Sequence, residues 1–114
     1  DSEITLDDEF TNRFIKSKGA LNESDTFTFT CTGGKGEVVL GFSTINTNRI
    51  SMNVECKCET DIKPISFSAK YLKEILMANK GSKSATLKIA SAGLAHVKFE
   101  RDGLVSSYYL VEIK

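Results

Sequence analysis

The side chains best suited to metal, redox or acid–base chemistry in this chain are three cysteines and one histidine. Cys56 and Cys58 are separated by a single residue, which is not the spacing of a zinc knuckle, and no second Cys/His pair accompanies them. An odd number of cysteines does not suggest a disulfide scaffold. We therefore expect Cys31, Cys56 and Cys58 to be buried or incidental thiols in a reducing compartment, and we expect no metal site.

The lone histidine, His96, gives no sign of catalysis. It lies on the polar side of a segment in which Ala95, Val97 and Phe99 form the apolar side. No motif places a Ser, a Cys or a pair of carboxylates beside it, and the sequence has no phosphate-binding loop. The sequence therefore predicts a protein that is not an enzyme, with no catalytic residue and no cofactor.

Two segments have helical spacing, near residues 7–17 and 69–80. In the first, Phe10 and Phe14 form an apolar stripe, Thr5 with Asp8 resembles a capping box, and Gly19 is expected to end the helix.

The second segment carries Leu72, Ile75 and Leu76 at i, i+3 and i+4. Ser68 is placed as its N-cap and Gly81 as its stop.

Positive charge lies on the helical segments, mostly opposite their apolar stripes, because successive positions are about 100° apart. The residues concerned are Arg13, Lys16, Lys18, Lys70, Lys73 and Lys80. Two interpretations are open: a lysine-rich face that confers solubility, or a shallow basic surface that contacts phosphates without reading bases. The net charge of zero argues mildly against nucleic-acid binding, yet it allows charges segregated onto separate faces.

The remaining segments alternate apolar and polar residues, as half-buried strands do. The expected order is strand 3–6, helix 7–17, strands 25–32, 36–43 and 48–57, then strand 64–68, helix 69–80, and strands 84–91, 94–101 and 104–113. This is β-α-β-β-β twice, with repeats near 1–60 and 61–114. We predict one α+β domain with largely antiparallel sheets and both helices on one face. No apolar run is long enough to span a membrane.

Three segments in the second repeat resemble a known family. Residues 67–76, in which a strand ending in Phe-Ser leads into a Tyr-Leu helix, resemble the last helix of sliding clamps of the proliferating-cell-nuclear-antigen type. Residues 84–89 resemble the strand that follows, and residues 107–111 are similar to the family's terminal Tyr-Tyr-Leu strand. Val111-Glu112 stands where the family has Ala-Pro, and this departure suggests a viral or phage clamp.

The resemblance implies a DNA polymerase processivity factor that encircles duplex DNA without sequence preference. The chain would be the C-terminal half of a two-domain subunit, and three such subunits would close a ring. The implied partners are duplex DNA, a DNA polymerase, a clamp loader and further copies of the subunit. The implied location is intracellular, at replication forks, in the nucleus or in the host cytoplasm for a viral protein.

The resemblance also assigns surfaces. The basic helix faces would line the central hole. The edge strand toward the next subunit would comprise Arg49, Ile50, Ser51, Met52, Asn53 and Val54. The pocket for partner peptides would draw on Leu94, Tyr109, Val111 and Ile113.

Alternatives remain open beside the clamp. Tyr109 and Val111 could be ordinary exposed strand residues, and Leu94 could be a hairpin contact. A checkpoint-type or scaffold relative of the clamps fits the same motifs. A duplicated sheet protein that grips DNA with its strands, as TATA-binding proteins do, would need basic and wedge-forming aromatic side chains on those strands. The strand surfaces here are mainly Thr, Ser and Asn.

Overall fold

The computed structural model describes residues 2–21, 25–41, 50–58, 61–80 and 84–113. The described elements are β1 (Ser2–Thr5), α1 (Asp8–Ala20), β2 (Thr26–Thr32), β3 (Lys35–Leu40), β4 (Ile50–Cys58), β5 (Ile62–Ser68), α2 (Ala69–Ala78), β6 (Ser84–Ala90), β7 (Leu94–Arg101) and β8 (Leu104–Val111). The order confirms two β-α-β-β-β units, with the boundary between β4 and β5.

The strands form one curled sheet of eight strands in the order β5-β2-β3-β4-β1-β6-β7-β8, and every neighbouring pair is antiparallel. The first strand of each unit pairs with the other unit: β1 lies between β4 of its own unit and β6 of the second, and β5 pairs with β2 of the first. The backbone pairing therefore joins the two units into one sheet.

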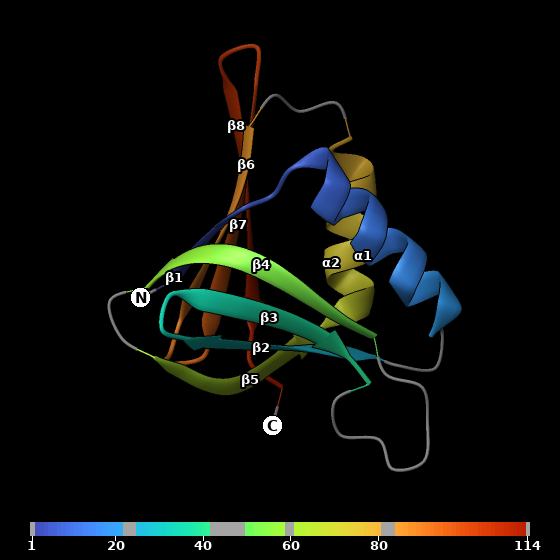
Figure 1. Cartoon of the computed structure of the whole chain (residues 1–114). Helices are drawn as coiled ribbons and strands as arrows, with labels where there is room; N and C mark the ends of the chain where they lie inside the picture. Colours follow the sequence, from blue (N-terminus) through green and yellow to red (C-terminus); the bar gives the residue numbers. More distant parts are fainter. Residues whose placement is uncertain (1, 22–24, 42–49, 59–60, 81–83, 114) are drawn as a thin grey trace.

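Both helices lie on the same side of the curled sheet, next to each other, and their chain directions are opposed (Figure 1). This confirms the expectation that the helices share one face. The arrangement follows from their apolar stripes, which must both be buried against the sheet.

The helix boundaries differ in part from those expected. Asp7 is the N-cap of α1, where its side chain accepts a hydrogen bond of 2.8 Å from the Phe10 backbone N–H, so the proposed Thr5–Asp8 capping box is wrong. The helix also continues past Gly19 to Ala20.

The start of α2 is as expected. Ser68 is its N-cap, and its hydroxyl accepts a hydrogen bond of 3.2 Å from the Tyr71 N–H. The proposed stop at Gly81 lies outside the described residues. With 13 and 10 residues, neither described helix is long and apolar enough to cross a membrane.

Two tight turns join neighbouring strands where the sequence indicated them. Gly33 and Gly34 connect β2 to β3 with φ of 60° and 81°. Asp102 and Gly103 connect β7 to β8 with φ of 50° and 80°. Two consecutive residues in the left-handed region match the twist of a two-residue hairpin, which is why glycine and aspartate occupy these places.

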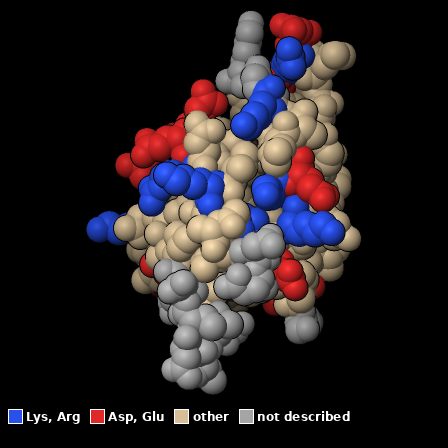
Figure 2. Space-filling view, turned by 90° about the vertical axis from the view of Figure 1, so that its right-hand side faces the viewer, with Lys and Arg blue, Asp and Glu red and all other residues tan. Residues whose placement is uncertain are grey.

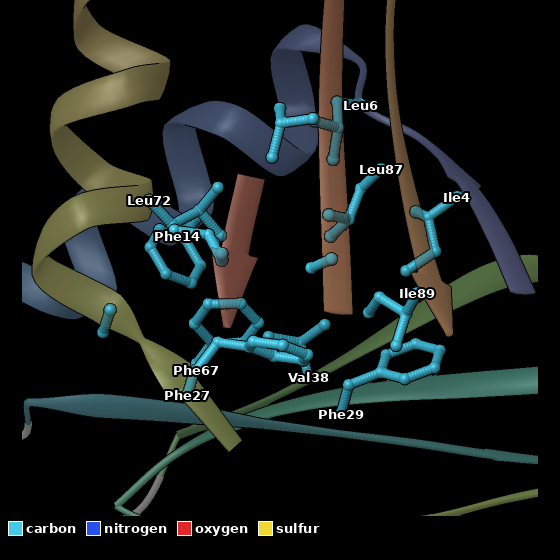
Figure 3. Packing of buried hydrophobic residues seen from close by; sticks show 14 of the residues in the cluster. Ile4, Leu6, Phe14, Phe27, Phe29, Val38, Phe67, Leu72, Leu87 and Ile89 are labelled. Atoms are coloured by element: carbon cyan, nitrogen blue, oxygen red, sulfur yellow. The ribbon is translucent and has the colours of Figure 1, made fainter. Parts of the chain in front are cut away.

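The core lies between the helices and the inner face of the sheet (Figure 3). Phe14 of α1 packs edge-on against Phe27 of β2, with ring centroids 5.6 Å apart. Phe27 in turn lies 5.7 Å from Phe67 of β5, its direct partner across the strands. Leu72 of α2 is also fully buried in this cluster. The core therefore joins both units.

The cysteines depart from expectation. Cys31 is buried in β2, and its Sγ lies 2.9 Å from the Sγ of Cys56 on β4. Gly36 of β3, between these strands, leaves room for the contact, since a Cβ there would lie 3.1 Å from the Cys56 Sγ. This contact is a hydrogen bond and not a disulfide, because Cys56 is in no disulfide. Cys31 itself is disulfide-bonded, so the expectation of buried or incidental thiols is wrong for this residue.

Truncating the shared core should unfold the whole domain. We expect Phe67→Ala to lower the free energy of unfolding by about 3–5 kcal/mol, because its ring is fully buried and the two units share it. Leu104→Ala, at a side chain that is 74% exposed, should change it by less than about 0.5 kcal/mol. Urea denaturation followed by circular dichroism measures both, and a small effect of Phe67→Ala would contradict this account of the core.

Candidate functional site

The helix face carries most of the predicted cations. Arg13 and Lys16 of α1 and Lys70 of α2 are exposed, as is Lys80 just beyond α2, and Lys73 is half-buried. Figure 2 views this face and shows Lys and Arg side chains crossing its middle, while Asp and Glu side chains lie mainly toward its margins. Among the described residues, none of these five cations forms an ion pair within 4.0 Å. Their charge is therefore available to an anionic partner.

Lys18 does not belong to this face. It was expected to follow the helix and face DNA, but it is only 6% exposed. Because α1 continues to Ala20, Lys18 lies one turn beyond Phe14 and two beyond Phe10, on the buried stripe. The assignment of Lys18 to a DNA-facing surface is wrong.

Acidic side chains also lie on the helices. Asp8 and Glu9 occupy the first turn of α1, where they interact favourably with the helix dipole, and Glu74 is exposed on α2. The face is thus basic in places rather than uniformly so. Such a surface can contact phosphates at a few points and has no side chains grouped to read base edges.

The expected edge strand is paired along one side. Residues 50–55 of β4 pair with β3, whereas Cys56 and the two residues after it pair with β1. In the described chain, no strand pairs with the other edge of residues 50–55. Those backbone groups can accept a further strand.

The side chains of this strand alternate as expected. Met52 is buried and Ile50 and Val54 are half-buried, while Ser51 and Asn53 are exposed. The Ser51 hydroxyl donates a hydrogen bond of 2.7 Å to Glu37 Oε2. Arg49, which the sequence also assigned to this edge, lies outside the described residues.

A hollow of about 430 Å³ lies between the unpaired edge of β4 and α1. Phe10 and Arg13 line it from the helix, and Asn53 and Glu55 line it from the strand. The hollow gives room beside the edge for side chains of an added strand.

The predicted partner pocket lies on the outer face of β7 and β8, away from the helices. Leu94 and Val111 are direct partners across the strands and are 43% and 72% exposed. Tyr109 is 62% exposed on the same face. Ile113 lies beyond the end of β8, where its N–H donates a hydrogen bond of 2.9 Å to the Ser66 carbonyl. We name Leu94, Tyr109 and Val111 the apolar wall.

Sequence reasoning missed one member of this surface. The His96 ring stacks on Tyr109 with centroids 4.6 Å apart and an angle of 9° between the rings. His96 and Tyr109 are direct partners across β7 and β8, but only the strand register reveals this. The His96 ring covers one face of the Tyr109 ring, and Tyr109 stays 62% exposed.

A second exposed apolar surface was also missed. Leu104 and Val105 at the start of β8 are 74% and 54% exposed, and Tyr71 on α2 is 59% exposed. Adjacent apolar residues directly after the Asp102-Gly103 turn break the alternation of β8, which was the available signal. Exposed apolar area of this kind commonly marks contact with another protein surface.

The described residues contain no group of three or more His, Cys, Asp or Glu side chains placed to hold a metal ion. The described residues instead present three surfaces: a partly basic helix face, an unpaired strand edge and an apolar wall.

Comparisons with known proteins agree on the fold. No protein-family model matches the sequence. No curated protein matches it either. Among solved structures, the chain is similar to the proliferating cellular nuclear antigen of Entamoeba histolytica, with a TM-score of 0.77 and 18% identity over 100% of this chain. It is also similar to the complex of PCNA2 and PCNA3 from Sulfolobus tokodaii, with a TM-score of 0.68 and 12% identity over 97% of this chain.

The chain spans about half of these structures, 46% of each matched chain. At such low identity the likeness establishes the fold, which is that of a sliding-clamp domain. Both matched proteins come from cellular organisms, so a viral or phage source stays a prediction.

The corrected position of Lys18 can be tested against its neighbour Lys16. We expect Lys18→Ala to lower the free energy of unfolding by about 1 kcal/mol or more, because its aliphatic stem packs in the interior. Lys16→Ala, on the exposed face, should change it by less than about 0.5 kcal/mol. Thermal and urea unfolding measure the stability of both variants. Equal stability of Lys18→Ala and Lys16→Ala would indicate that Lys18 is exposed.

Proposed function

We propose that this chain is one domain of a DNA sliding clamp, a ring that encircles duplex DNA and holds a polymerase on its template. The observation that carries the proposal is a clamp fold over the whole chain whose two helices present unpaired cations on one face. The fold supports this function over a TATA-binding-like grip, which would use the strands.

DNA contact would be electrostatic. Arg13, Lys16, Lys70, Lys73 and Lys80 would approach phosphates from the inside of the ring. Few contacts from each domain give weak, salt-sensitive binding. Weak contact suits a protein that must slide, because the closed ring, rather than affinity, would keep it on the duplex.

Ring closure would use the unpaired edge of β4. Strand addition at residues 50–54 would satisfy backbone groups that now lack a strand partner, and Arg49 would belong to the same edge. Since the chain spans 46% of each matched chain, we propose that it forms the C-terminal half of a two-domain subunit and that three subunits make the ring.

Replication proteins would dock outside the ring. The apolar wall, with Ile113 beside it, would receive apolar and aromatic anchors of a polymerase or clamp-loader peptide, at replication forks inside the cell. Truncation of anchor contacts of this kind typically costs more than about 1 kcal/mol of binding free energy.

The DNA proposal is tested by removing charge from the helix face alone. Replacing Lys16, Lys70, Lys73 and Lys80 by Ala should weaken binding of the chain to two unrelated duplexes equally. Each lost phosphate contact should reduce the slope of log K against log salt by about 1. Fluorescence anisotropy over a range of salt concentrations measures both quantities.

A matched control removes the same charge from the strands, with Lys35, Lys57, Lys63 and Lys98, all exposed, changed to Ala. The control should retain the salt slope of the parent. An equal loss in both variants would mean that net charge, and not the helix face, governs binding.

The assembly proposal is tested by amide hydrogen exchange. Of residues 50–55, the alternate amides that point away from β3 should exchange quickly in the monomer and become protected when sedimentation shows assembly. Amides of β3, which is paired on both sides, provide the internal control. Assembly without new protection on β4 would place the interface elsewhere.

A further inference from the structure

A hollow of about 640 Å³ shares only one lining residue with the apolar wall and none with the helix face or with residues 50–55 of β4. It is lined by the start of β1, the end of β4, the turn after β2, and the hairpin of β6 and β7. Leu94 lines the hollow and is also part of the apolar wall. The hollow is therefore continuous with the proposed docking surface.

One polar atom at this hollow lacks a partner. The His96 Nε2 is a buried side-chain nitrogen without a hydrogen bond within the described chain, and His96 lines the hollow. The Ser2 Oγ also lacks one, but Ser2 pairs with the buried Ile89 and so points to the inner face of the sheet, whereas His96, opposite Lys88, points to the outer face. Buried polar groups are nearly always paired, so the unpaired imidazole nitrogen indicates a ligand.

Charged side chains flank His96 on the outer face. Lys57, Glu3 and Lys88 are direct partners across β4, β1 and β6, and Lys88 is the partner of His96. Residues directly opposite each other share a face, so the row continues from Lys57 to His96 and the ring of Tyr109. Within the described chain, Glu3 forms no ion pair within 4.0 Å with either lysine.

The chemistry of this set selects a carboxylate. An imidazole with its proton on Nε2 and two ammonium groups all donate, and a carboxylate accepts with both oxygens. Building on the proposed docking function, we infer that this hollow binds an acidic side chain of the peptide that docks on the apolar wall. The peptide thus carries an Asp or Glu beside its apolar anchors, over Lys88 and His96.

The inference is tested with peptides selected on the chain itself. Short random peptides displayed on phage are selected for binding to the chain and counter-selected against the Leu94→Ala/Val111→Ala variant. The surviving peptides are expected to combine apolar anchors with an Asp or Glu. The best of them is synthesised with its acidic residue and with the matching amide, Gln or Asn.

Calorimetric titration then compares the two peptides. The acidic peptide should bind the parent about ten-fold more tightly, as a charge-assisted hydrogen bond provides. Lys88→Met should reduce this preference to about two-fold or less, and Glu3→Gln, which removes a competing carboxylate, should increase it. Circular dichroism confirms that each variant is folded.

Lys98→Met is the matched control, since Lys98 is exposed on β7 two residues from His96 and does not line the hollow. It should keep the full preference. Equal affinity of the two peptides for the parent overturns the inference while the docking surface stands. An equal loss in Lys98→Met also overturns it, and failure to recover any peptide overturns the docking surface together with the inference.

Discussion

Phe27 lies between Phe14 of α1 and Phe67 of β5, and this aromatic contact holds the two halves of the chain together. Each ring is fully buried. Phe14 and Phe27 come from the first unit and Phe67 from the second, so neither half can bury its own aromatic surface without the other. Burial of apolar area is the main favourable term in folding, and here one core cluster draws its residues from both units. The two helices lie side by side because both cover this one core.

The pairing of the first strands joins the units through the backbone as well. β1 lies between β4 of its own unit and β6 of the second, and β5 pairs with β2 of the first. The helices cover one face of the sheet and leave the other free. The helix face, the unpaired edge of β4 and the apolar wall consequently lie on different parts of the domain. The proposed function would use this arrangement, because DNA, the neighbouring subunit and client proteins would bind at the same time.

The sequence alone determined the elements and their order. Period-two alternation around Phe27 and Phe67 marked buried strands, Ser68 marked the start of α2, and glycine at positions 33, 34 and 103 marked the hairpins. These signals are local: a side chain two residues away shares a strand face, and a cap bonds within its own turn. The faces of the strands followed as well, since Tyr109 is exposed and Leu110 is buried, as the alternation requires.

The tertiary structure decided what depends on distant residues. Helix α1 is longer than the local signals indicated, because neighbouring elements cover its last turn. Lys18 therefore lies on the buried stripe and not on the basic face. The pairing of β7 with β8 placed His96 on Tyr109, and that of β1 with β4 and β6 set Glu3 between two lysines. No local sequence pattern specifies which residues lie opposite each other on neighbouring strands, because this register is fixed by the packing of the whole core. The sequence therefore specified the elements and the faces of the strands, and packing decided where α1 ends and which outward-facing residues meet.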